Sequence, residues 1–194
     1  ASQPAAPMPL VSRSPADCDS HIRAIPVIET FNAEVWQRVN VIEGKAILSP
    51  PRFLFGTDIE TRLQLREAIY SKDIVEGRFL EVSDRGTNNC VISRQIAEEF
   101  GKGVGDTLRV ERQDLQIVGI YHCGSLLLDV AIVVDIDRVR ELTRFGEESV
   151  SALYIAHAEG EDDAEIIDRI EEAFEGRRRD VWQSSTLSDL QPQN

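Results

Sequence analysis

The first candidate for chemistry in this chain is a glycine-rich run, Gly101-Lys102-Gly103-Val104-Gly105. Its composition is that of a phosphate-binding loop. Such a loop lies between a strand and the helix that follows it, whereas this run follows a predicted helix and precedes a predicted strand. We therefore interpret the run as a turn. The sequence contains no Walker A pattern, so we expect no ATP binding by the chain itself.

Histidine and cysteine side chains are the next candidates. His21, His122 and His157 lie far apart in the sequence, without the carboxylate or thiol spacing that is typical of a metal site. His122 and Cys123 are adjacent, and neighbouring residues of a strand point to opposite faces, so they do not predict a thiol–imidazole nucleophile. We expect no catalytic residue, no metal and no cofactor, and hence no enzyme.

The three cysteines do not form a disulfide framework. Cys18 shares a predicted helical face with Ile22 and Ile25, which favours a buried thiol. Cys90 and Cys123 could pair in an oxidising compartment, and the sequence leaves open whether they are bonded.

Two further groups of residues have structural interpretations. The tryptophans Trp36 and Trp182 lie in predicted strands and are expected to pack in a core or an interface. Acidic residues crowd the first turn of a predicted helix, where the helix dipole favours a solvated negative face. These acids are Glu161, Asp162, Asp163 and Glu165.

Composition and charge exclude some classes of protein. The 194 residues are 42% hydrophobic and 28% charged, which is ordinary for a globular domain, and the net charge is −13. This charge argues against nucleic acid or an anionic membrane surface as the main partner. The sequence shows neither a signal peptide nor an apolar run that approaches the roughly 18 residues of a membrane helix.

The elements of residues 77–134 are the clearest in the chain. A turn at residues 76–79 precedes an apolar run at 90–92, and Ser93 is placed to cap a helix over 94–100. Gly101 follows the last apolar residue of that helix, where a left-handed cap requires glycine. A hairpin over 107–111 and 115–121 and a buried strand at 130–134 are expected next.

The flanking segments predict further strands and helices. Thr57 and Glu60 have the spacing of a capping box, which predicts a helix that ends at the Gly77 turn. The remaining elements are a tether at 1–9, strands at 10–13, 27–39, 45–55 (broken by prolines), 150–156 and 181–184, and helices at 14–25, 135–145 and 162–175. Thr186 and Asp189 predict the first turn of one more helix. Together these elements indicate an α+β fold.

The ordered series "GRF", "VIS…A..F", "G.GVGDTLRV…..IVGIY" and "D.AIVV….V..L" resembles one family. It is similar to the extracytoplasmic domain of MacB-like and FtsX-like ABC transporter permeases, which include lipoprotein-releasing (LolC/LolE-type) permeases. The resemblance covers residues 76–145 well and extends more weakly to residues 8–181. The family-motif residues, for which a structural role is expected, are Gly77, Arg78, Phe79, Gly105, Asp106, Gly119 and Asp129.

The resemblance implies a fold of two lobes. A ferredoxin-like split βαβ (porter-like) lobe would comprise residues 10–56 and 148–185, and a smaller inserted α+β (sabre-like) lobe would comprise 57–147. Residues 1–9 would be the tether, and residues 186–194 would begin a helix that leads toward the membrane.

The function implied by the resemblance is mechanical. The domain would couple cytoplasmic ATP hydrolysis to the movement of a substrate or partner protein outside the inner membrane, without covalent chemistry. Its expected partners are a twin or paralogous permease subunit, a cytoplasmic ATPase subunit or domain and, as a further candidate, a periplasmic adaptor or a lipoprotein, with no nucleic acid. The domain would be periplasmic, and the full-length chain would lie in the inner membrane.

Two alternatives belong to other classes. A free-standing periplasmic adaptor or binding module would show no hydrophobic segments beside this sequence, whereas a permease is expected to have one before it and three after it. A small hydrolase would need a nucleophile, a base and an orienting group, and no such set is visible. The sequence does not select a transported substrate or distinguish a homodimer from a heterodimer.

Overall fold

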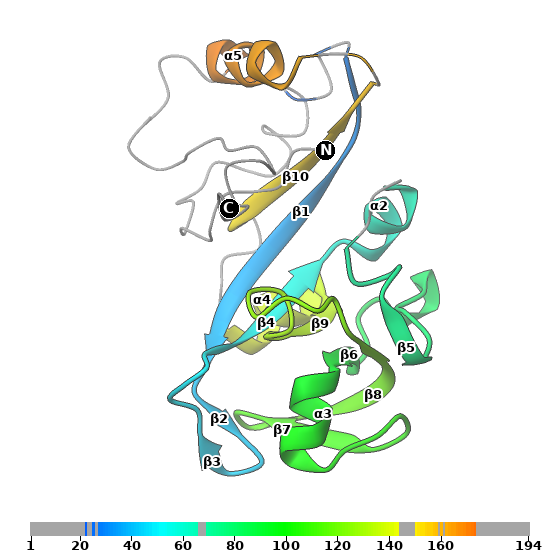
Figure 1. Ribbon diagram of the computed structural model, residues 1–194, viewed down its shortest axis with the longest axis vertical. Coiled ribbons are helices and arrows are strands. Elements are labelled where there is room, and N and C mark those ends of the chain that lie inside the picture. The colour runs from blue at the N-terminus through cyan, green and yellow to red at the C-terminus, as the bar shows by residue number, and fades with distance from the viewer. Residues whose placement is uncertain are drawn as a thin grey trace. The chain divides into compact units, whose positions relative to one another are not determined.

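The structure is a computed structural model that describes residues 22, 25, 27–65, 69–143, 150–158, 160 and 162–173 (Figure 1). The predicted tether, the strand at 10–13, most of the helix at 14–25, the strand at 181–184 and the helix start at 186–194 lie outside the described residues. So do Cys18, His21 and Trp182.

The chain divides into two compact units, of which the first is Ala1–Glu34 with Gly146–Asn194 and the second is Val35–Phe145. In the first unit, strand β10 (Ala152–His157) pairs antiparallel with the first half of strand β1 (Ile28–Val39). Helix α5 (Asp163–Ala173) buries Ile166 and Ile170 in a small cluster with Ile25. The Asp162 carboxylate accepts hydrogen bonds from the Ala164 and Glu165 amides and so caps this helix.

The second unit is a sheet with short helices. Its strands follow the order β1-β4-β9-β6-β8-β7-β2-β3, and β5 also pairs with β8. The strands are β2 (Val41–Ile42), β3 (Lys45–Ala46), β4 (Arg52–Thr57), β5 (Ile74–Gly77), β6 (Asn89–Ser93), β7 (Thr107–Val110), β8 (Gln113–Tyr121) and β9 (Ala131–Asp135). The helices are α2 (Ile59–Gln64), η1 (Val82–Asp84), α3 (Arg94–Phe100) and α4 (Ile136–Thr143).

The sheet of the second unit is mixed. Strands β4 and β9 pair in parallel, as do β6 and β8, while β5 and β7 run antiparallel to β8. The α+β class predicted from the sequence is confirmed. The ferredoxin-like and sabre-like labels stay a prediction, because the predicted strands at 10–13 and 181–184 lie outside the described residues.

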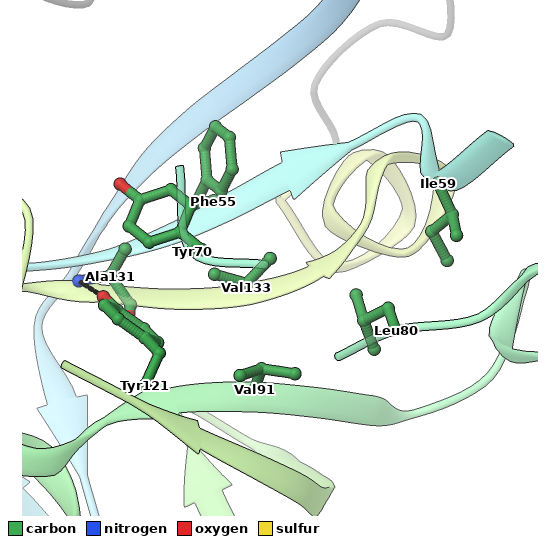
Figure 2. Close-up of a cluster of buried hydrophobic side chains, with 8 residues drawn as sticks. All are labelled: Phe55, Ile59, Tyr70, Leu80, Val91, Tyr121, Ala131 and Val133. Carbon is green, nitrogen blue, oxygen red and sulfur yellow. Dashed lines mark hydrogen bonds between the residues drawn. The ribbon is translucent and has the colours of Figure 1, made fainter. Parts of the chain in front are cut away.

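The core of the second unit gathers side chains from several strands and loops (Figure 2). A chain of aromatic contacts crosses it: the ring centroids of Trp36 and Phe55 are 4.5 Å apart, those of Phe55 and Tyr70 are 5.2 Å apart, and those of Tyr70 and Tyr121 are 4.8 Å apart. The buried Arg62 guanidinium lies 5.5 Å from the Phe55 ring centroid. Trp36 therefore packs in a core, as expected.

The local signals around α3 predict its ends correctly. The Ser93 hydroxyl accepts a hydrogen bond from the Ile96 amide at 3.2 Å, and Gly101 adopts a left-handed conformation with φ 61°. Both features depend on residues close in sequence, which is why the sequence alone identifies them.

Helix α2 differs from its prediction at both ends. Asp58, not Thr57, is its N-cap, because Asp58 Oδ1 accepts from the Thr61 amide at 3.0 Å while Thr57 is the last residue of β4. The helix ends at Gln64. Gly77 belongs to strand β5 instead of a turn that ends this helix.

Candidate functional site: a framework of glycines and buried aspartates

The seven family-motif residues lie in or beside β8 or in segments that contact it. Gly77 ends β5, and Gly119 faces it from β8 in the register of the two strands. Gly105 and Asp106 form the turn before β7, and Asp129 lies in the loop between β8 and β9. The structure thus brings the predicted residues to three contacts and one turn within the second unit.

The first contact is a close approach of two backbones at Gly77 and Gly119. A Cβ atom on Gly119 would lie 2.0 Å from the Arg78 carbonyl oxygen, and one on Gly77 would lie 2.3 Å from the Val118 carbonyl oxygen. Gly77 also has φ +71°, which side chains disfavour. The Arg78 amide donates to the Val118 carbonyl at 3.0 Å. Only glycine fits at both positions.

The second contact is an ion pair between Arg78 and the buried Asp84. The Arg78 guanidinium donates in a bidentate manner, with Nη1 2.6 Å from Asp84 Oδ2 and Nη2 3.0 Å from Oδ1. A bidentate pair of this kind fixes the relative orientation of the two side chains and strengthens their interaction. Arg78 Nη1 also donates to the Phe79 carbonyl at 2.9 Å, and the Phe79 ring packs against the core cluster.

Asp84 also binds two neutral donors. Its carboxylate accepts from the Glu81 amide at 2.7 Å and from Asn89 Nδ2 at 2.6 Å, which joins residues 78–84 to the start of β6. Burial alone would raise the pKa of Asp84, but the hydrogen bonds from Arg78, Glu81 and Asn89 outweigh it and lower the pKa to about 2. Asp84 was not among the predicted site residues, and its only signal in the sequence is its place as an acid shortly after the "GRF" arginine.

The third contact fixes the loop between β8 and β9 through Asp129, which is 1% exposed. Asp129 Oδ1 accepts from the Cys123 amide at 2.8 Å, and Oδ2 accepts from the Gly124 amide at 3.1 Å. His122 Nδ1 lies 3.1 Å from the same Oδ2. One carboxylate therefore organises the first three residues of the loop.

The Tyr121 hydroxyl fastens the same loop from inside the core (Figure 2). It lies 2.8 Å from the Leu128 carbonyl oxygen and 2.9 Å from that of Ala131, and it accepts from the Ala131 amide at 3.1 Å. Burial is the largest cause that raises the pKa of Tyr121, so the hydroxyl stays protonated and can donate. The loop is held at both of its ends.

The glycine-rich run is a turn, as predicted. Asp106 Oδ2 accepts from the Gly103 amide at 2.8 Å, and the Gly105 amide donates to the Ile117 carbonyl at 2.9 Å. Gly105 has φ +93°. These amides bind the protein itself, which leaves neither of them to hold a phosphate.

The sulfur and imidazole groups of the described residues face different partners. Cys123 Sγ lies 3.3 Å from Asp73 Oδ2, whereas the neighbouring His122 faces Asp129. Cys90 and Cys123 are both free thiols, so the bond that the sequence left open is not formed. Burial raises the pKa of each thiol, and Asp73 adds to this effect at Cys123.

His157 contacts the first turn of helix α5. Its Nε2 lies 2.8 Å from Asp163 Oδ1 in the first turn of α5. In the part of the chain that the structure describes, no group of three or more histidine, cysteine, aspartate or glutamate side chains is placed to hold a metal ion. The contacts around β8, by contrast, hold backbone segments of the second unit to one another.

A family model and several solved structures match this chain. The family model described as "MacB-like periplasmic core domain" matches residues 3–173, which is most of the chain. No curated protein gives a significant match. Among the described helices, none has both the length and the apolar character needed to cross a bilayer.

Solved structures share the fold at low sequence identity. The extracellular domain of the noncanonical ABC-type transporter YknZ from Gram-positive bacteria is 17% identical with a TM-score of 0.58, covering 84% of this chain and 78% of that one. The periplasmic region of MacB from Actinobacillus actinomycetemcomitans is 12% identical with a TM-score of 0.60, covering 83% and 72%. A domain of a putative permease from Porphyromonas gingivalis is 15% identical with a TM-score of 0.53, covering 87% and 71%.

Proposed function

This chain belongs to the family of MacB-like periplasmic core domains of ABC transporter permeases, and on that premise we propose that it couples cytoplasmic ATP hydrolysis to movement outside the inner membrane. The moved species would be a substrate or a partner protein. The observation that carries the proposal is the family match over residues 3–173. The domain itself would do no covalent chemistry.

The framework around β8 supports a mechanical role. A domain that transmits motion must resist deformation, because a soft domain would absorb the displacement internally. The Gly77–Gly119 approach leaves no room for a methyl group, and Asp84 and Asp129 each hold a connecting segment by several hydrogen bonds. Such a unit can move as one body.

In physical terms the permease would have two states whose populations a distant ligand shifts. ATP would bind a separate cytoplasmic ATPase, favour one arrangement of the membrane helices and move this domain against that of a twin or paralogous subunit. An adaptor or a lipoprotein is a further possible partner. A porter-like lobe with an inserted sabre-like lobe remains our assignment for the two parts of the domain.

Fractionation of source cells tests whether the domain belongs to a membrane-embedded permease. An antibody against this domain should detect a chain larger than 21.7 kDa that stays in the membrane pellet after alkaline carbonate washing. In spheroplasts, added protease should remove the epitope, because the domain faces outward. A protein released in soluble form with the periplasmic contents would instead identify a free-standing adaptor.

A further inference from the structure

Three leucines of the second unit are far more exposed than any other large apolar side chain in the described residues. Leu48 is 82% exposed, Leu126 is 81% exposed and Leu127 is 77% exposed, whereas the next value, that of Val82, is 50%. Single exposed leucines are common, but a group of them at one place marks an interaction surface.

The three leucines lie at the same edge of the sheet. Leu48 precedes strand β4, and Leu126 and Leu127 precede strand β9. These two strands run parallel with Phe53 opposite Ala131, so the segments that enter them meet at one edge. Two contacts join the segments directly: the Phe53 amide donates to the Val130 carbonyl at 3.1 Å, and Arg52 Nη1 lies 3.4 Å from the Asp129 carbonyl oxygen. We name Leu48, Leu126 and Leu127 the leucine edge.

The β8–β9 loop holds its two leucines outward on a fixed backbone. Asp129 binds the amides of Cys123 and Gly124, and the Tyr121 hydroxyl lies within hydrogen-bond distance of the Leu128 carbonyl. The Leu128 side chain packs against the core, so the loop is anchored beside its exposed tip. This arrangement keeps Leu126 and Leu127 in water, which is unfavourable unless another surface covers them.

The leucine edge is also uncharged. Residues 46–51 read AILSPP and residues 123–128 read CGSLLL, without an acidic or basic residue, in a chain of which 28% is charged. Together the three exposed side chains offer roughly 400 Å² of apolar surface, which is comparable in area to functional patches on monomers. It falls short of the roughly 800 Å² per partner of a stable interface, so it would be one part of a larger or transient contact.

We propose that the leucine edge docks into an apolar groove with a basic rim on a separate protein. The net charge of −13 complements such a rim and repels a second copy of this chain. A membrane surface fits less well, because neither run contains the aromatic, lysine or arginine residues that anchor a loop at lipid headgroups. The proposal goes beyond the transport function and does not depend on ATP-driven motion.

Photocrosslinking in the source cell tests which molecule covers the edge. p-Benzoylphenylalanine replaces Leu127 in the full-length protein, and the control places it at Leu63, which is 49% exposed on α2. We expect one protein adduct, identified by mass spectrometry, that forms from position 127 and not from position 63. Adducts with only a second copy, adducts with only lipid, or no adduct would overturn the proposal.

A binding measurement without nucleotide then tests the mode of contact. The protein identified in the adduct is purified and titrated against three forms of the domain. These are the wild type, the triple variant (Leu48→Ser, Leu126→Ser and Leu127→Ser together) and the control variant Leu63→Ser. We expect the triple variant to weaken binding at least about tenfold and the control to change it less than about twofold. Because the proposed rim is basic, binding should also weaken with added salt.

Because all four leucines are exposed, the variants should keep the melting temperature of the wild type, and this is checked in the same preparations. An affinity for the partner that the triple substitution leaves unchanged would refute the leucine edge even if the permease assignment stands. Loss of the permease assignment in cell fractionation would leave this binding result unaffected, so the two failures are distinguishable.

Discussion

Two segments of the second unit, residues 78–84 and residues 122–130, are each fastened by one buried aspartate, and they differ in what that aspartate binds. Asp84 faces the Arg78 guanidinium and two neutral donors. Asp129 faces two backbone amides and His122. The first segment is held by a full ion pair, whereas the second is held mainly by the dipoles of its own backbone.

The difference corresponds to what each segment presents to solvent. Residues 78–84 carry charged side chains, and Arg78 also lies 3.7 Å from Glu81. Residues 122–130 present two exposed leucines. Fastening a loop through its own amides leaves its tip free of charge, which an apolar docking surface requires. The following predictions test this comparison and the backbone contact at Gly119, a residue of the β8 strand that lies between the two segments in sequence.

The largest effect is expected for Gly119→Ala. The added methyl group would overlap the Arg78 carbonyl, a backbone atom that cannot move without breaking the β5–β8 pairing. We expect the free energy of unfolding to fall by more than about 3 kcal/mol, measured by urea denaturation. Gly103→Ala is the matched control, because only Asp106 Oδ2 at 3.8 Å lies near its added methyl group. Equal stability of the two variants would show that the close approach does not exist.

Asp129→Ala should have the next largest effect. It leaves the amides of Cys123 and Gly124 without the buried carboxylate that accepts from them, which we expect to cost about 3 kcal/mol of unfolding free energy. Asp129→Asn retains one side-chain oxygen and should cost about half as much. If the alanine variant unfolds at the same urea concentration as the wild type, the loop is not fastened as described.

A pH dependence distinguishes Asp84 in the first segment. Its folded-state pKa of about 2 lies below the ordinary value of about 3.9, so the ion pair stabilises the domain above pH 4. This contribution is lost as the pH falls from about 4 to about 2. We expect the free energy of unfolding of the wild type to exceed that of Asp84→Asn by up to about 2 kcal/mol at pH 6. This difference should vanish near pH 2.

The control for the pH series is Asp114→Asn, since Asp114 is exposed and lies 3.8 Å from Arg109. Its stability difference from the wild type should be small at every pH, as for other surface pairs. A difference for Asp84→Asn that stays constant from pH 6 to pH 2 would contradict the ion pair.

The smallest effect is expected for Tyr121→Phe. This change removes the hydroxyl that contacts Leu128 and Ala131 and keeps the ring, so we expect a loss of about 1 to 2 kcal/mol. Amide hydrogen exchange should then show faster exchange at residues 125–131 than in the wild type. Unchanged protection of the Ala131 amide would mean that Tyr121 only fills space.

Helix caps and most strand positions were predictable from neighbours in sequence, whereas the pairing of the strands was not. Ser93 and Gly101 identify the ends of α3 because a cap is a local hydrogen bond. The start of α2 was misplaced by one residue because Thr57 pairs with Asp135 in the parallel β4–β9 ladder, which extends the strand and leaves Asp58 to cap the helix.

The candidate site shows the same division. Gly77 and Gly119 were identified, but the reason for these two glycines, a backbone approach between β5 and β8, becomes visible only when the strands are paired. Asp84 was missed because only the folded path of residues 78–84 places its carboxylate beside the Arg78 guanidinium. The run Leu126 to Leu128 would pass for core by composition, yet only Leu128 packs inward.

The central proposal is that the second unit moves as one stiff body when ATP binds elsewhere. The direct test measures distances between spin labels at Glu98, which is exposed on α3, in each of two permease subunits reconstituted with their ATPase in nanodiscs. A second sample carries labels at Glu98 and Asp114 of one subunit. We expect ATP to shift the distance between subunits and to leave the distance within the second unit unchanged. A distance between subunits that is identical with and without ATP would contradict it.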